Sequence, residues 1–219
     1  MAEGESPWRA LKDYGAAVAL AIAIAVVIRV FLLEAYRVPT PVMRPTLEPG
    51  DLIFASKWTF GIRLPGGAGS ITEGRAPERG EVVIYRSPET PDQLFVKRVM
   101  ALEGETVEFR AGRLAVNGKT LDFVPAASQA CGREGSYPVC LEPPLVEDFG
   151  PETVPQGSVF VVGDLRSSPE ARAPWAIVPR SAVEAKALLI WMSVDPDPKG
   201  SEFGLIPRIR FDRVLTDIR

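Results

Sequence analysis

The chain has 219 residues, 46% of them hydrophobic and 24% charged, which is typical of a folded protein and not of a disordered one. Its 25 basic and 28 acidic side chains give a net charge of −3, so the charge does not indicate nucleic-acid binding. Histidine is absent, which excludes Ser-His-Asp and Cys-His catalysis and every histidine-ligated metal site. Two cysteines are too few for a four-cysteine zinc site, and we expect no metal and no cofactor. Any nucleophilic chemistry must use a base other than imidazole, most simply a lysine.

The first predicted element is an apolar segment at residues 14–33, after a tail at residues 1–13. No residue from Tyr14 to Ile28 is charged. A helix over this segment would be about 30 Å long, enough to cross a bilayer, and Arg29 near its end could extend to the lipid headgroups. A cleaved signal peptide would end in a small-x-small pattern, which residues 33–36 (LEAY) lack. We expect an uncleaved single-pass transmembrane helix, with a signal peptide or a buried core helix as the alternatives.

The rest of the chain, residues 34–219, reads as a mainly β, antiparallel body. Ala111-Gly112 and Asn117-Gly118 are typical of tight turns between strands. The Gly- and Pro-bearing stretch 122–155 is interpreted as a large inserted surface loop, as is 66–80. Short β-branched or alternating runs predict strands at residues 81–85, 94–102, 106–110, 114–116, 159–162 and 186–193.

The two cysteines indicate on which side of the membrane the body lies. Cys131 and Cys140 flank a loop, CGREGSYPVC, and a disulfide between them would contribute about 2–3 kcal/mol through loop closure. A disulfide requires an oxidising compartment, whereas two free thiols would suit a cytosolic loop. Basic residues are nearly balanced on the two sides of the apolar segment, so they do not decide its orientation. We expect the body outside the cytoplasm and the first dozen residues inside.

Five sequence motifs follow the apolar segment. Residues 38–47 read VPTPVMRPTL and residues 50–57 read GDLIFASK. Residues 95–105 read FVKRVMALEGE, residues 162–164 read VGD and residues 190–193 read IWMS. One such motif alone would be weak, but five in this order behind a single apolar segment are specific.

These motifs resemble those of bacterial signal peptidase I (leader peptidase), over most of residues 14–213. The resemblance implies a fold of antiparallel sheets anchored in the bacterial inner (plasma) membrane, with its body outside the cytoplasm. It also implies that the partners are the lipid bilayer and the signal peptides of exported preproteins, which the family cleaves. In the family a serine attacks the scissile carbonyl and a lysine is the general base, which agrees with the absence of histidine.

Lys97 matches the family's general base. In an extended strand alternate residues share a face, so Phe95, Lys97, Val99 and Ala101 are expected to lie together, among apolar neighbours. Desolvation there would lower the pKa of the amine, and a base working near neutral pH needs a fall of ~3 units from about 10.4. The alternative is an ordinary exposed strand lysine.

Val42 stands where the family has its nucleophilic serine. The matching residues on both sides fix this register. An isopropyl group has no heteroatom to deprotonate or acylate. Thr40 matches the family's oxyanion-binding hydroxyl, and its promotion to nucleophile would need the scissile bond to shift by several ångströms.

The motif that contains Gly163 and Asp164 also departs from the family, which has approximately G-D-N-R-D-N-S-x-D-S-R there. Residues 163–173 read GDLRSSPEARA, so the supporting residues Gly163, Asp164 and Arg166 are kept. Leu165 replaces an asparagine, and Pro169, Ala171 and Ala173 replace the serine that orients the lysine, the aspartate and the closing arginine. A one-residue gap would instead align Ser168, Glu170 and Arg172 with those three positions.

Two functions follow. The first is a signal peptidase I homologue with impaired catalysis that retains a peptide groove or a partner role, for example with an active signal peptidase. The alternative is an active serine endopeptidase of the Ser-Lys type, through an unrecognised nucleophile or because the natural chain carries serine at position 42. An alternating apolar stripe after the second motif resembles the family's membrane-facing surface, and the alternative is that it packs in the core. Its residues are Trp58, Phe60, Ile62 and Leu64. The groove is expected between residues 34–42 and 94–97, with substrate-binding positions Val38, Pro39, Pro41, Met43, Leu94, Phe95 and Val96.

Overall fold

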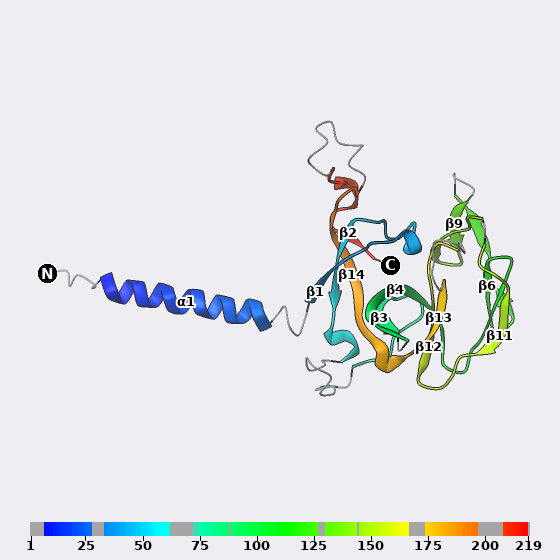
Figure 1. The fold of residues 1–219 in the computed structure, drawn as a ribbon, viewed down its shortest axis with the longest axis horizontal. Coiled ribbons are helices and arrows are strands. Elements are labelled where there is room, and N and C mark those ends of the chain that lie inside the picture. The colour runs from blue at the N-terminus through cyan, green and yellow to red at the C-terminus, as the bar shows by residue number, and fades with distance from the viewer. Residues whose placement is uncertain are drawn as a thin grey trace.

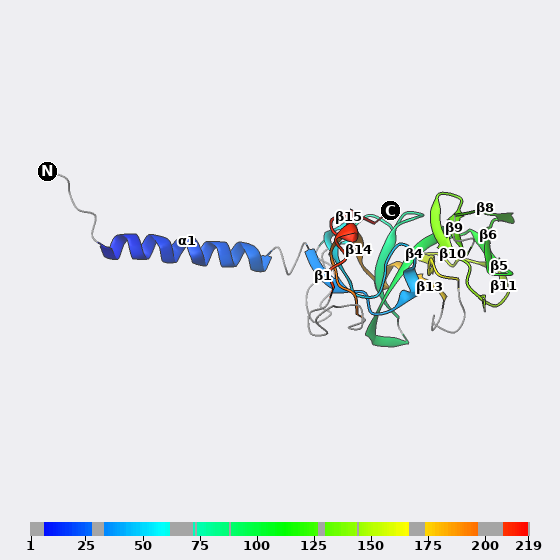
Figure 2. The ribbon, with the colours of Figure 1, turned by 90° about the horizontal axis from the view of Figure 1, so that it is seen from above.

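The computed structural model describes residues 7–27, 33–61, 72, 74–87, 89–126, 130–143, 145–166, 174–196 and 208–218. Within these residues the protein is mainly β, with one long helix, α1 (Pro7–Val27), and antiparallel sheets. Figures 1 and 2 both show α1 projecting away from the sheets, with the large sheet nearest to it and the smaller sheets on the far side. The predicted antiparallel β body is therefore confirmed.

The large sheet carries the motif residues. Among the described residues it has the strand order β1-β2-β14-β3-β4-β12-β13, with β15 beside β14. All six predicted strands are present, four in this sheet and two in a smaller sheet, with bounds that differ from the predicted ones by at most a few residues. Its strands are β1 (Leu33–Arg37), β2 (Asp51–Ser56), β3 (Val82–Ser87), β4 (Thr90–Leu102), β12 (Ser158–Val162), β13 (Trp175–Pro179), β14 (Val183–Ser193) and β15 (Thr216–Asp217).

Two smaller sheets form the far end of the body. The first has the order β11-β5-β6-β7 and the second β10-β9-β8. Their strands are β5 (Thr106–Arg110), β6 (Arg113–Val116), β7 (Lys119–Thr120), β8 (Phe123–Pro125), β9 (Cys131–Glu134), β10 (Tyr137–Cys140) and β11 (Phe149–Thr153).

The stretch 122–155, interpreted from the sequence as a surface loop, instead contains the four strands β8 to β11. Its strands are short and interrupted by Gly and Pro, so the sequence signal for each is weak. What makes them stable is packing, because Val139, Val146 and Val154 are buried. This segment is therefore part of the core.

The two predicted tight turns are confirmed. Ala111 (φ 50°) and Gly112 (φ 74°) connect β5 to β6, and Asn117 (φ 54°) and Gly118 (φ 72°) connect β6 to β7. Positive φ at both central residues is the geometry that matches the twist of a two-residue hairpin.

The N-terminal helix differs in its bounds from the predicted span 14–33. α1 begins at Pro7, and Leu33 is already the first residue of β1, where it pairs with Ser56 of β2. Apolar side chains along α1, such as Leu20 and Ile22, are exposed. In the part of the chain that the structure describes, no helix combines the length and the apolar character needed to cross a membrane.

The predicted apolar stripe 58–64 is only partly within the described residues. Trp58–Phe60 forms the short 3-10 turn η3, with Trp58 exposed and Phe60 packed against the core. Ile62 and Leu64 lie outside the described residues.

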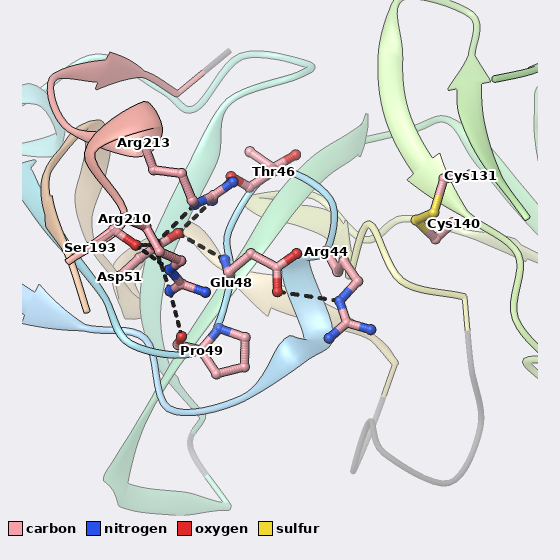
Figure 3. Close-up of polar contacts among 10 residues, drawn as sticks. All are labelled: Arg44, Thr46, Glu48, Pro49, Asp51, Cys131, Cys140, Ser193, Arg210 and Arg213. Carbon is pink, nitrogen blue, oxygen red and sulfur yellow. Dashed lines mark hydrogen bonds and ion pairs between the residues drawn. A yellow bond between two sulfur atoms is a disulfide. The ribbon is translucent and has the colours of Figure 1, made fainter. Parts of the chain in front are cut away.

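A buried carboxylate ties the C-terminal segment to the large sheet. Asp51, at the start of β2, accepts hydrogen bonds from Ser193 Oγ (2.6 Å) and Arg213 Nη2 (2.6 Å). Arg210 donates to the Pro49 carbonyl (2.7 Å), as Figure 3 shows. Burial alone would raise the pKa of Asp51, but the hydrogen bonds from Arg213 and Ser193 outweigh it and lower the pKa. The 3-10 turn η6 (Phe211–Arg213) is thereby fixed over the loop that follows Val42.

Candidate functional site

The segment 34–42, expected to be extended throughout, turns before its end. β1 ends at Arg37, Thr40 is still extended (φ −128°, ψ 154°), and Pro41–Met43 forms the 3-10 turn η2. The two prolines of this segment have no N–H to donate to a ladder, which is why strand pairing stops. Thr40 and Val42 therefore do not belong to one continuous strand.

Buried side chains fix the turn that carries Val42. Met43 and Leu47 belong to the apolar cluster beneath β2 and β14, and the Leu47 amide donates to the Met43 carbonyl (2.9 Å). Val38, predicted to contact substrate, is also buried in this cluster. Its amide and carbonyl bond to the backbone of Asp51 and Gly50. Val38 is thus a core residue here.

Val42 itself is half-buried and packs against the segment after β12. Its carbonyl accepts a hydrogen bond from the Leu165 amide at 3.0 Å. A Cβ added to Gly163 would lie 2.6 Å from the Val42 carbonyl oxygen and 2.7 Å from Val42 Cγ1. Position 163 therefore has no room for a side chain, which explains glycine there. The side chain in the nucleophile's position offers carbon and hydrogen only, and cannot form an acyl intermediate.

Lys97 is buried, with 1% of its surface exposed. It lies on β4 opposite Val83, one position along its face from Phe95 and Val99. Those residues belong to an apolar cluster that also holds Val161. Desolvation, together with the positive charge of Arg166, lowers the pKa of Lys97 to about 7. Much of the amine is then neutral at neutral pH, as a general base must be.

The turn and the lysine strand are neighbours in space. η2 packs against β4, and β12, which leads into Gly163, pairs with β4 at Val162 and Arg98. Val42, Gly163 and the part of β4 that carries Lys97 therefore meet at one end of the large sheet.

An ion pair that the sequence analysis missed holds this meeting point together. Arg98 and Asp164 are both buried and form two hydrogen bonds, at 2.8 and 2.6 Å. Arg98 also donates to Thr46 Oγ1 (3.0 Å), and the Thr46 hydroxyl donates to Asp164. The sequence signal was present, since Arg98 adjoins Lys97 and Thr46 lies in the same motif as Val42.

A second buried ion pair involves Glu134, which the sequence analysis also missed. Arg166 Nη2 donates to Glu134 (2.9 Å), and the Arg166 guanidinium lies over the Phe109 ring at 5.3 Å. Glu134 also accepts a hydrogen bond from the Leu114 amide (3.0 Å). Burial lowers the pKa of Arg166, and the charges of Glu134 and Asp164 oppose that effect. No sequence pattern marks Glu134, because its partner is 32 residues away.

The predicted groove strand 94–97 has one edge without a paired strand among the described residues. Leu94 to Lys97 pair with β3, whereas the pairing of β4 with β12 reaches only as far as Arg98. Leu94 is exposed, and Phe95 and Val96 are half-buried. The open edge adjoins η2, where Pro39 is exposed and Pro41 is half-buried.

Cys131 and Cys140 form a disulfide across β9 and β10, with their Cα atoms 3.9 Å apart (Figure 3). Glu142 lies near their sulfurs, but the sulfurs are bonded to each other and are not available as metal ligands. Pro169, Ala171 and Ala173, and the alternative Ser168, Glu170 and Arg172, lie outside the described residues.

Two described hydroxyls near β1 and β2, those of Thr40 and Ser56, are not placed like a serine at position 42. Thr40 precedes η2 and is exposed. Ser56 is buried and bonded to the Thr59 hydroxyl at 2.7 Å. Ser56 is opposite Lys186, which forms an ion pair with Glu81 at 2.8 Å.

We predict that Lys97 titrates near pH 7 because its burial disfavours the ammonium form. The test is a pH titration of protein with ¹³C-labelled lysine ε-carbons by NMR, with the Lys97→Arg variant to assign the signal. Lys57, which forms an exposed ion pair with Glu34, is the internal control. A Lys97 midpoint near 10 would contradict the prediction.

Comparison with known proteins shows the family to which the chain belongs. Residues 11–192 match the family described as signal peptidase, peptidase S26. A signal peptidase I from Pseudomonas aeruginosa is 31% identical over 91% of this chain and 78% of its own length. One from Bacillus amyloliquefaciens is 36% identical over 70% of each chain. A crystal structure of a signal peptidase I from Enterococcus faecalis is 30% identical, covering 51% of this chain and 97% of that one, with a TM-score of 0.37. The chain belongs to the signal peptidase family, peptidase S26.

Proposed function

We propose that this protein binds the extended segment before the cleavage site of a signal peptide and does not cleave it. The observation that carries the proposal is the Val42 side chain. It occupies the position of the attacking hydroxyl and packs against Gly163, and η2, which carries it, packs against the strand of the buried base Lys97. The isopropyl group of Val42 has no oxygen from which a base could take a proton, so residue 42 cannot start acyl transfer.

Binding can persist without the nucleophile because it uses other groups. The open edge of β4 at residues 94–97 offers backbone donors and acceptors to an added strand. Apolar side chains of Leu94 and Val96 point to one face of that edge, where they can contact the small apolar residues that precede a signal-peptide cleavage site. In this proposal Val42 makes the groove more apolar than a serine would.

The central test is to mix the detergent-solubilised full chain with a preprotein and to measure binding and cleavage separately. We expect saturable binding and no cleavage. Leu94→Glu should weaken binding by about tenfold, because the carboxylate loses hydration when an apolar peptide covers it. Val124→Glu, an exposed valine on the separate β8 strand, is the matched control and should bind normally.

The same experiment decides between this function and an active peptidase. The lowered pKa of Lys97 is the observation that favours activity, because a working base needs it. Cleavage at one site that is lost in the Lys97→Ala variant would overturn the proposal. Absence of both binding and cleavage would overturn it as well.

A serine alone should not restore catalysis. We expect Val42→Ser to give weak cleavage or none, because Pro169 and Ala171 stand where the family has the groups that support the lysine. Proline has neither a hydroxyl nor an N–H to orient an amine. Val42→Ala is the control, and cleavage by Val42→Ser at a rate typical of the family would show that this interpretation of residues 163–173 is wrong.

We also propose that the apolar segment 14–33, whose residues 14–27 belong to α1, anchors the protein in the bacterial inner membrane, with the body outside the cytoplasm. The apolar side chains of α1 are exposed and have no core to cover them in the described residues. The disulfide agrees with an oxidising compartment. After expression in bacteria, we expect the protein to stay in the membrane pellet at alkaline pH and to be digested by protease added to the periplasmic side. Release of the intact chain, or full protection, would contradict this topology.

A further inference from the structure

The disulfide-bonded hairpin β9–β10 lies directly against the segment that supports Val42. The two strands pair from Cys131 and Cys140 at one end to Glu134 and Tyr137 at the other. Cys140 is fully buried, so its contacts are part of the interior. The hairpin belongs to a stretch that the five sequence motifs do not include.

Cys140 makes two backbone hydrogen bonds to the segment Asp164–Arg166. Its amide donates to the Asp164 carbonyl (2.9 Å), and its carbonyl accepts from the Arg166 amide (2.7 Å). Cys140 and Leu165 thereby form a parallel bridge. The backbone of Asp164–Arg166 is held from one side by the residue that carries the disulfide.

Glu134 holds the same segment through a side chain. Its carboxylate accepts a hydrogen bond from Arg166 Nη2 at 2.9 Å, and both side chains of this ion pair are buried. Arg166 Nε and Nη1 have no hydrogen-bond partner in the described part of the chain, so the Glu134 bond is the directional contact of this guanidinium there. Removing it would leave a buried cation poorly compensated.

On its other side, Asp164–Arg166 reaches both halves of the site. The Leu165 amide donates to the Val42 carbonyl (3.0 Å), and the Asp164 carboxylate binds Arg98, the neighbour of Lys97 on β4. An unbroken series of hydrogen bonds therefore leads from the disulfide-bearing strand to the turn of η2.

We propose that the Cys131–Cys140 hairpin, with Glu134, is a redox-sensitive positioning element for the Val42 turn, so that reducing the disulfide loosens residues 164–166 and weakens peptide binding. The binding part of this inference rests on the proposed function, whereas the loosening does not. In the reduction, a dithiol such as dithiothreitol gives two electrons and two protons to the disulfide, which yields two cysteine thiols and the oxidised cyclic reductant.

Hydrogen exchange of the full chain in detergent tests the loosening directly. Reduction should speed the exchange of the Arg166 amide, which donates to Cys140, by about tenfold or more, because β10 loses its covalent closure. The Leu165 amide, which donates to Val42, should also exchange faster, because Cys140 then holds residues 164–166 less tightly. Amides paired between β2 and β14, in the same molecule, should exchange at an unchanged rate. This contrast separates local opening from general unfolding.

A second variant avoids dependence on the reductant. Glu134→Gln in the oxidised protein should speed exchange of the Arg166 amide in the same way, because the amide side chain cannot replace the charge opposite Arg166. Glu105→Gln, which removes the partly exposed pair with Arg79, should leave it unchanged. If neither reduction nor Glu134→Gln changes exchange at residues 165 and 166, or if β2 and β14 change equally, the proposal is overturned.

Preprotein binding in the two redox states completes the test. Weaker binding after reduction, by about the same factor as the increase in exchange, supports the full inference. Faster exchange with no binding in either state refutes the proposed function and leaves the positioning role standing. Faster exchange with equally tight binding in both states refutes the link between the hairpin and the groove.

Discussion

The buried ion pair between Arg98 and Asp164 is the contact on which the site depends. It joins two segments that are 66 residues apart, one of which carries Lys97 while the other packs against Val42. Arg98 follows Lys97 on β4, and Asp164 follows Gly163, against which Val42 packs. Thr46 shares the pair and adds the loop after η2. Both charges are buried, so removing either one would leave the other uncompensated, which is strongly destabilising. The pair therefore fixes the relative positions of the three segments.

The site has a buried lysine with a lowered pKa, whereas Val42 has no heteroatom. Burial lowers the pKa of Lys97, whose neighbours Phe95 and Val99 belong to an apolar cluster, and the charge of Arg166 adds to the effect. The turn of η2 and the close approach at Gly163 do not require a hydroxyl. In the proposed function the effect of Val42 is therefore on the chemistry of the site. The open edge of β4 is the feature that we propose for peptide binding.

One of the smaller sheets contacts the segment that follows Gly163. Glu134 on β9 pairs with Arg166, and Cys140 on β10 bridges to Leu165. These contacts come from a part of the chain outside the five motifs, and they hold the segment that packs against Val42. The Asp51 cluster holds the loop that follows Val42, because Arg213 donates hydrogen bonds both to Asp51 and to the Thr46 carbonyl.

The sequence by itself determined the family, the antiparallel β class, the two tight turns and the identity of the residue in the nucleophile's position. These follow from local patterns: ordered motifs, alternating strands, and Gly after Ala or Asn at positive φ. Only the tertiary structure decided that the segment 122–155 is strand and core, that Val38 is buried, and that Val42 lies in a turn instead of a strand. It also revealed Glu134 and Thr46 as partners of Arg166 and Arg98. The physical reason is distance along the chain, because these residues are stabilised by partners that no local window contains.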